Sequence, residues 1–293
     1  MIQWDSRINI HAQEAGTGMK ETTKQELSRI ARRMRMLRAL DYVKFLFDRI
    51  KNRRPNCEFA RRNPGFIIPP AGLSYEALGH TSSEQYYRSG IAQAEFVMQI
   101  VRDYVAHPEP RICEWGCGPG RIVRHLPAKL AGRAEGICGA DFNPRSIAWC
   151  RKNIDGVRFE CNSLHPPLPF EDGFFDFVYA LSVFTHLDEP GWTEWIEELS
   201  RVTRTDGVVF FTTHGKNSIH KLLPDEKDSF LGGRPVFRTS AAKGKKWYVA
   251  YHPSSYICDT LPSEFDLVVH EEKATVFSLP QEIWVVRKSG PQC

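Results

Sequence analysis

The residues best suited to chemistry form a short glycine-rich stretch, RICEWGCGPGR, at positions 111–121. Residues 111–115 have the composition of a buried strand end, and three glycines then alternate with other residues: Gly116, Gly118 and Gly120. Apolar residues recur at helical spacing from Ile122, so we expect a strand, a glycine loop and a helix with Pro119 in its first turn. Such a loop lets backbone N–H groups approach a ligand closely, and a helix N-terminus favours negative charge.

Two carboxylates accompany this loop. Asp141 comes about 21 residues after Gly120, at the end of a strand expected over 135–140, where it can accept both hydroxyls of a ribose. Glu114 stands just before the first glycine, and the spacing is G-x-G-x-G rather than the G-x-G-x-x-G of dinucleotide sites. A carboxylate there would repel a pyrophosphate and attract a ligand that carries an ammonium and a sulfonium. S-adenosylmethionine is such a ligand.

The sequence E-x-G-x-G-x-G followed by Asp141 resembles the first two motifs of class I S-adenosylmethionine-dependent methyltransferases. The resemblance covers about 75–287 and includes LPFEDGFFDFVYALSVFTHL and RVTRTDGVVFFTTHG, which are similar to the family's fourth motif and its fifth helix and strand. It implies an α/β fold with a Rossmann-like seven-stranded sheet of order 3-2-1-4-5-7-6, helices on both faces, and an N-terminal helical extension. The last strand is antiparallel, and 265–270 with 282–287 have the pattern of that hairpin. The segments SVFTHL, TTHG and QEIWVVRK look like bacterial methyltransferases of polysaccharide or natural-product biosynthesis.

We expect two parts of the chain. Residues 1–82 form an extension, with a basic amphipathic helix over about 23–51 and a Pro/Gly-rich irregular connector over 55–82. Residues 83–293 form the methyltransferase domain, which begins with a helix over about 83–105. Within it, 214–250 reads as an insertion, a strand-rich flap that in this family usually shapes the acceptor pocket. The regular alternation predicts strands over 111–115, 135–140, 157–161, 174–180 and 208–213, and helices over 119–130 and 144–153.

The resemblance implies that the cofactor lies along the carboxyl ends of the strands. After the third strand the family often carries an acid for the adenine amino group. Here the amide oxygen of Asn162 or the hydroxyl of Ser163 would take that amine. The expected cofactor-binding residues are Glu114, Gly116, Cys117, Gly118, Gly120, Asp141, Phe142, Asn162, Ser163, Ala180, Leu181 and Ser182. We expect no metal, because Cys113 and Cys117 have no second pair at zinc-ligand spacing.

Two histidines are candidates for catalysis. Methyl transfer from a sulfonium mainly requires alignment of the acceptor and exclusion of water, but a hydroxyl acceptor also benefits from a general base with a pKa near 7. His186 and His214 follow strand ends on the ligand side, and His186 is the first candidate. Either could instead be a structural histidine bonded to backbone, and an amine or thiolate acceptor would need no base.

These features predict an S-adenosylmethionine-dependent methyltransferase that methylates an oxygen of a small-molecule or saccharide acceptor by in-line displacement. One alternative is a methyltransferase-like scaffold without catalysis, whose basic helix binds a partner. Another is a nicotinamide-dependent oxidoreductase. The second would need a Tyr-x₃-Lys or similar hydride-transfer apparatus, which we do not find.

Composition sets the remaining expectations. The chain has 42% hydrophobic and 25% charged residues, as soluble globular proteins do, and its net charge of +4 does not favour nucleic acid. Residues 1–65 contain 15 Lys/Arg and 7 Asp/Glu, a net of +8, so the other 228 residues carry −4. We expect the basic helix to pack on the domain or on a second copy, or to bind an anionic membrane surface or carrier. The absence of a signal-peptide h-region or a spanning apolar run, and the scattered cysteines, predict a cytoplasmic protein with reduced thiols.

Overall fold

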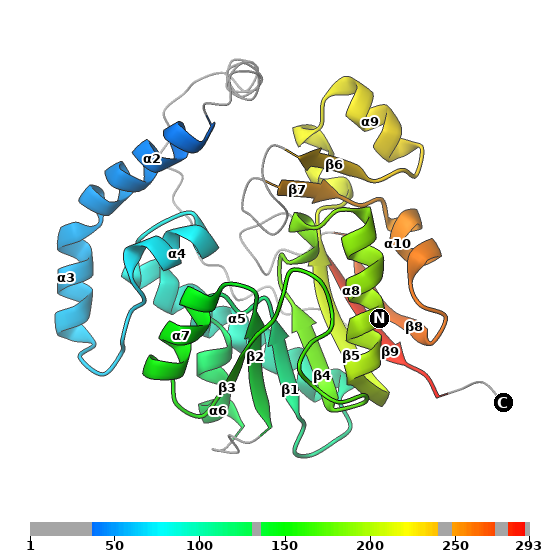
Figure 1. Cartoon of the computed structure of the whole chain (residues 1–293), viewed down its shortest axis with the longest axis horizontal. Coiled ribbons are helices and arrows are strands. Elements are labelled where there is room, and N and C mark those ends of the chain that lie inside the picture. Colours follow the sequence, from blue (N-terminus) through cyan, green and yellow to red (C-terminus); the bar gives the residue numbers. More distant parts are fainter. Residues whose placement is uncertain (1–36, 131–135, 240–247, 273–280, 291–293) are drawn as a thin grey trace.

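The computed structural model describes residues 37–130, 136–239, 248–272 and 281–290, and its centre is a seven-stranded sheet (Figure 1). The strand order is β3-β2-β1-β4-β5-β9-β8. The strands are β1 (Ile112–Trp115), β2 (Ile137–Asp141), β3 (Arg158–Cys161), β4 (Phe175–Ala180), β5 (Thr203–Thr213), β8 (Phe265–Glu271) and β9 (Glu282–Lys288). Strands β1 to β5 pair in parallel, and β9 runs antiparallel to both of its neighbours. The predicted order and reversed last strand are therefore confirmed.

Helices cover both faces of the sheet, which explains why its central strands are almost continuously apolar. Every residue of β1, β2 and β4 is buried. Phe177 and Tyr179 of β4 point into a cluster beneath α5 (Ser83–Tyr104), α6 (Leu126–Lys129) and α7 (Pro144–Asn153). Val178 points to the opposite face, into a cluster with α8 (Glu189–Val202) and α10 (Ser254–Thr260). The two clusters make the sheet a rigid base for the loops at its strand ends.

Two helix starts agree with the sequence and one does not. Ser82 caps α5 by accepting a hydrogen bond from Gln85 N–H, and Asn143 caps α7 by accepting one from Arg145 N–H. The helix expected over 119–130 is wrong: turns follow β1, and only a short 3₁₀ segment η1 (Val123–His125) and α6 are helical. Gly120, which lies within the expected range, has a φ of 71°, which a right-handed helix does not allow, and Gly116 and Gly118 before it also have positive φ, at 77° and 51°. Pro119 therefore lies in a turn.

The N-terminal part contains more helix than expected. The predicted helix over 23–51 lies partly outside the described residues, and within them α2 covers Leu37–Lys51. The prediction of an irregular connector over 55–82 is wrong, because α3 covers Arg53–Arg62 and α4 covers Ala71–Leu78. Pro55 is tolerated because it lies in the first turn of α3, where backbone N–H groups have no partner within the helix. In Figure 1, α2 and α3 form an arm beside α4 and the body of the molecule.

The segment between β5 and α10 forms a small second layer at the same end of the sheet as the arm (Figure 1). It contains a 3₁₀ segment η3 (Lys216–Lys221), α9 (Pro224–Leu231) and an antiparallel pair of strands, β6 (Val236–Thr239) and β7 (Tyr248–Tyr251). Strand β7 contacts another 3₁₀ segment, η2 (Phe184–His186), which follows β4. The pair of strands thus lies against the loop that carries His186.

Candidate functional site

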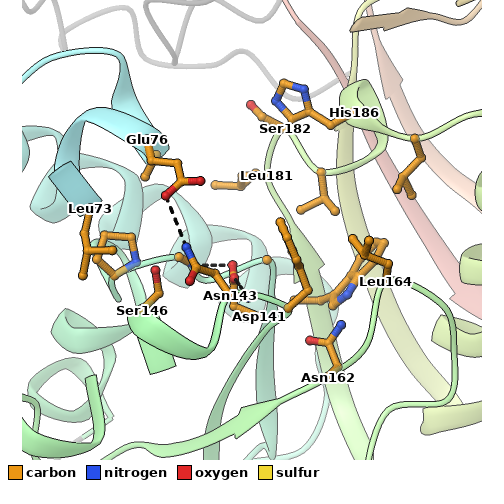
Figure 2. Close-up of a pocket in the computed structure, with 18 of the residues that line it drawn as sticks. Leu73, Glu76, Asp141, Asn143, Ser146, Asn162, Leu164, Leu181, Ser182 and His186 are labelled. Atoms are coloured by element: carbon orange, nitrogen blue, oxygen red, sulfur yellow. Dashed lines mark hydrogen bonds between the residues drawn. The ribbon is translucent and has the colours of Figure 1, made fainter. Parts of the chain in front are cut away.

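The main cavity has a volume of ≈ 340 Å³ and lies at the carboxyl ends of the parallel strands, where the loops after β1, β2, β3 and β4 meet α4. Figure 2 shows His186 and Ser182 at one end of this cavity, Asn162 at the other, and Asp141 between them. An elongated ligand is the natural occupant of such a space. Nine predicted site residues line it: Gly116, Gly118, Asp141, Phe142, Asn162, Ser163, Leu181, Ser182 and His186.

The glycine loop is held by the next strand. The N–H groups of Gly116 and Cys117 both donate to the carbonyl of Ala140, at 2.7 and 3.0 Å. A side chain at Gly116 would place its Cβ 2.3 Å from Val183 Cγ2, so no larger residue fits there. A Cβ at Gly118 would meet only Ala77 within 4 Å, at 3.6 Å, although its φ of 51° still favours glycine. The backbone at Gly118 therefore forms an open wall of the cavity.

Asp141 is fixed by backbone donors at the centre of the site. Its Oδ2 accepts a hydrogen bond from Gly118 N–H at 2.8 Å, and its Oδ1 accepts one from Asn143 N–H at 2.7 Å. The side chain of Asn143 donates to Glu76 of α4 at 3.3 Å, as Figure 2 shows, so α4 is tied to this edge of the sheet. A carboxylate oxygen can accept more than one hydrogen bond. The carboxylate of Asp141 can therefore still accept hydroxyl groups from a ligand in the cavity.

Asn162 has a buried acceptor atom that receives no hydrogen bond from the described residues. Its amide Nδ2 donates to the carbonyl of Ser163 at 2.7 Å, whereas its Oδ1 is buried and has no hydrogen-bond partner among the described residues. An orphaned buried acceptor is costly, and a ligand that donates to it removes the cost. The hydroxyl of Ser163 is bonded to the carbonyl of His165. Of the two residues that the sequence left open, Asn162 is the better placed for an amine.

Glu114 differs from the simplest expectation, since it does not line the main cavity. Its side chain is only 4% exposed, and Oε2 accepts hydrogen bonds from Val123 N–H at 2.9 Å and Tyr179 O–H at 3.0 Å. It lines a smaller cavity of ≈ 160 Å³ behind the glycine loop, together with Arg121 and Gln281. Burial raises the pKa of Glu114 to about 8, although the Arg121 guanidinium and the two hydrogen bonds lower it. Its contact with a cofactor stays a prediction.

Three predicted residues line neither cavity. Gly120 faces the interior, where an added Cβ would lie 2.5 Å from Ile154 Cδ1, and Ala180 is buried beneath α8. His214 follows β5 but packs against Tyr251 of β7, with ring centroids 5.5 Å apart. A turn in the chain after Thr213 thus takes this second catalytic candidate away from the cavity. Cys117 lines only the smaller cavity, beside Glu114.

Sequence reasoning missed the contribution of α4. Leu73, Glu76 and Ala77 line the main cavity, but they come from a stretch that reads as an irregular connector because of its prolines and glycines. The smaller cavity also contains Gln281, whose Oε1 lies 2.9 Å from Ser182 Oγ and 2.8 Å from Thr212 Oγ1. Gln281 comes just before β9, almost a hundred residues after Ser182, so no local pattern could have paired them.

His186 has a defined tautomer. Its Nδ1 lies 2.7 Å from the backbone carbonyl of Tyr248 in β7. A carbonyl only accepts, so Nδ1 carries the hydrogen, and the lone pair of the neutral ring is on Nε2. Burial lowers the pKa of His186 below its usual 6.5, an effect that the bond to Tyr248 partly offsets. The neutral ring at the end of the cavity can therefore accept a proton near neutral pH.

Comparison with known families decides what kind of domain this is. Residues 112–207 match the model of a family described as a methyltransferase domain. This part of the chain is a class I S-adenosylmethionine-dependent methyltransferase domain. The PH0226 protein from Pyrococcus horikoshii has the same fold: the match has a TM-score of 0.50 at 17% identity and covers 80% of this chain and 99% of that one.

Curated relatives match part of the chain. It is 28% identical over 148 residues to a malonyl-[acyl-carrier protein] O-methyltransferase from Halorhodospira halophila, which is 48% of each chain. It is 25% identical over 112 residues to a ubiquinone biosynthesis O-methyltransferase from Neisseria meningitidis, 36% of this chain and 45% of that one. The chain thus spans about half the length of the curated relatives it matches.

The cofactor of this domain class is S-adenosylmethionine, and the residues present fit it. Asp141 offers a fixed carboxylate for the ribose hydroxyls, and the orphaned Oδ1 of Asn162 offers an acceptor for the adenine amine. Within the described parts of the chain, no three His, Cys, Asp or Glu side chains are grouped to hold a metal ion. Over the same residues, no helix has both the length and the apolar character that a membrane span requires.

Proposed function

We propose that this protein is an S-adenosylmethionine-dependent methyltransferase that methylates a hydroxyl of a small-molecule or saccharide acceptor. When bound, S-adenosylmethionine supplies an electrophilic methyl group on a sulfonium. The main support for an oxygen acceptor is the state of His186. Its imidazole is neutral, and the Nε2 lone pair is available at the cavity end opposite Asn162. As the acceptor oxygen bonds to the methyl carbon and the bond from that carbon to sulfur breaks, Nε2 of His186 would take the hydroxyl proton. Both curated relatives are named O-methyltransferases, which also supports oxygen as the atom that is methylated.

The walls of the cavity support a small acceptor that is shielded from water. Apart from its polar groups, the cavity is lined by large apolar side chains, among them Leu73, Leu164, Val183, Leu187 and Trp195. Exclusion of water strengthens the electrostatic interactions in the site and prevents loss of the methyl group to solvent. Leu73 belongs to α4, which precedes the first strand of the sheet in the sequence.

We further propose that residues 214–250 act as an acceptor-shaping insertion within a domain spanning 83–293, preceded by the extension 1–82. The support is the bond between His186 and the carbonyl of Tyr248, because it makes β7 responsible for the orientation of the base. We also propose a cytoplasmic location, on the ground that the seven described cysteines form no disulfide with one another.

Cofactor binding is the first test. Calorimetry with S-adenosylhomocysteine should give saturable binding with wild-type protein. Asp141→Asn should weaken that binding roughly ten- to hundredfold, the usual effect of removing a charged hydrogen-bond acceptor. The matched control is Asp259→Asn on the exposed side of α10, which should bind as wild type does. No binding by folded wild-type protein at millimolar ligand would refute the assignment.

Turnover tests the oxygen acceptor. A panel of phenols, saccharides and hydroxy acids, each with an amine analogue, is incubated with methyl-labelled cofactor. We expect transfer to hydroxyl compounds, and we expect His186→Gln to lower kcat by roughly 10²- to 10⁴-fold while S-adenosylhomocysteine binding is retained. Equal kcat for the two proteins on a hydroxyl acceptor would remove His186 as the base. Cofactor binding without transfer to either class would favour a scaffold that does not catalyse.

A further inference from the structure

The outer face of α2 exposes an apolar stripe that the rest of the described chain does not cover. Leu40, Val43, Phe47 and Ile50 recur every three or four residues, so they lie on one side of the helix. Their exposed fractions are 51%, 61%, 69% and 75%. Single exposed apolar residues are common, but four on one helix face make a contiguous patch of the kind that binds something.

The opposite face of α2 uses its acidic residues for internal contacts. Asp41 accepts a hydrogen bond from the hydroxyl of Tyr75 at 2.8 Å. Asp48 accepts hydrogen bonds from the N–H and the hydroxyl of Thr81, at 2.6 and 2.8 Å. Phe45 packs on the ring of Tyr75, with centroids 5.1 Å apart. The helix is therefore anchored in one orientation, and the stripe faces away from the body.

Cations border the stripe on both sides. At about 100° per residue, Lys44 and Lys51 lie on one flank of the stripe, and Arg49 lies on the other flank, beyond the exposed apolar residues Tyr42 and Leu46. All three cationic side chains are exposed. Further arginines lie on α3, where Arg53, Arg54 and Arg61 line a shallow hollow that also contains Glu58, so cations outnumber acids there. With both carboxylates of α2 turned inward, the outer face presents apolar and positively charged groups together.

We propose that this face of α2, with the adjoining arginines of α3, binds the surface of an anionic lipid bilayer. An apolar stripe with cations on both flanks is the pattern of a helix that lies in the interface, with its stripe among the acyl chains and its cations at the lipid phosphates. A second copy of this chain would bring the same cations against one another, which is unfavourable. A protein partner would need a groove shaped to this convex ridge, whereas a bilayer accommodates a ridge of any shape.

The position of the arm connects this surface to the cofactor cavity. The inner face of α2 contacts Tyr75 of α4, and the neighbouring residues Leu73 and Glu76 of α4 line the cavity. The proposed lipid-binding surface and the cavity wall are thus two sides of one packed unit. The inference concerns binding alone, so it stands or falls independently of the proposed methyl transfer.

Vesicle sedimentation with the full chain tests the proposal. We expect binding to phosphatidylcholine vesicles that contain phosphatidylserine, little binding to phosphatidylcholine alone, and weaker binding as salt is raised. Phe47→Gln with Ile50→Gln should weaken the binding at least roughly tenfold, because both side chains would leave the acyl region. The matched control is Leu231→Gln with Leu267→Gln, two other exposed apolar residues, at 69% and 45%. This control should bind as wild type does.

A second pair of variants tests whether the lysines beside the stripe contribute to vesicle binding. Lys44→Gln with Lys51→Gln should weaken binding to the anionic vesicles roughly tenfold or more. Lys152→Gln with Arg234→Gln, exposed cations elsewhere on the domain, should leave it unchanged. Circular dichroism and melting should show that all four double variants fold.

Three results would overturn the proposal. One is absence of vesicle binding by wild-type protein. Another is binding that neither α2 variant weakens, which would place the lipid contact elsewhere in the chain. The third is a wild-type dimer in sedimentation velocity without lipid that dissociates in the Phe47→Gln/Ile50→Gln variant, which would assign the stripe to a second copy.

Discussion

The buried carboxyl of Glu114 should make cofactor affinity depend on pH. In the protein without ligand, burial raises its pKa to about 8, so the group is mostly protonated at pH 7. A ligand with an ammonium and a sulfonium favours the charged carboxylate, and an opposite charge within about 4–6 Å lowers such a pKa by about 1–3 units. Binding should therefore release a proton. Affinity should rise as the pH rises towards 8 and level off above it.

The magnitude follows from the two pKa values. If the bound pKa is about 6, two units below the free value, linkage gives an increase in affinity of about 50-fold between pH 6 and pH 9. At pH 7 about 0.8 proton is released per cofactor bound. The amide that Glu114→Gln introduces is neutral at every pH, and its oxygen can accept the same bonds from Val123 and Tyr179. The variant should therefore lose the pH dependence that comes from this position.

Calorimetry in buffers of different ionisation enthalpy measures both quantities. S-adenosylmethionine and S-adenosylhomocysteine are titrated into wild-type and Glu114→Gln protein between pH 6 and pH 9. Each ligand's own titration cancels in the difference between the two proteins. The effect should be larger for S-adenosylmethionine, which has the additional sulfonium charge. Equal proton release by wild type and variant would show that Glu114 does not respond to the cofactor, and the charge argument for this acid would then fail.

Four further predictions follow from the same structure. The raised pKa of Glu114 should make the ligand-free protein lose stability as the pH rises from 4.5 to about 8, and urea unfolding of Glu114→Gln should lack that decrease. Asn162→Leu removes the orphaned acceptor and should weaken S-adenosylhomocysteine binding roughly tenfold by calorimetry. Because burial lowers the pKa of His186, kcat/KM for the acceptor, measured with S-adenosylmethionine saturating at every pH, should stay constant down to below pH 6.5 and then fall as the ring is protonated. Trp192→Ala should cost about 3–5 kcal/mol in urea unfolding, since this fully buried ring packs on Phe184 beneath the site.

The sheet and the cofactor half of the site could be predicted because their signals are local. A parallel strand buried on both faces reads as an apolar run, and the residue that follows it faces the ligand edge. That rule was enough for Asp141, which ends β2, for Asn162, which follows β3, and for His186 in η2 after β4, and all three line the cavity. It failed for His214 after β5, because the chain turns there towards Tyr251 and carries the ring away from the cavity.

The other features of the fold and the site could not be predicted, because they depend on backbone conformation or on contacts between residues far apart in the sequence. The positive φ of Gly120 delays the helix after β1, and a sequence with apolar residues at helical spacing does not show this. Helix α4 looked irregular because prolines and glycines flank it, although Gly79, at φ 75°, merely ends it. Glu114 was correctly placed beside the loop, but its inward bonds to Val123 and Tyr179 depend on a partner 65 residues away.

The strand ends and the added segments contribute differently to the cavity. The loops at the ends of β2, β3 and β4 supply Asp141, Asn162 and His186, whereas α4 contacts Asn143 beside Asp141 and β7 contacts His186. Helix α4 supplies one wall, and β7 orients His186 through the carbonyl of Tyr248. These added segments pack on the sheet edge without contributing strands to it. Substitutions in β7 that disturb the contact with His186 should consequently change methyl transfer while cofactor affinity is preserved, and substitutions of Asp141 or Asn162 should mainly lower cofactor affinity.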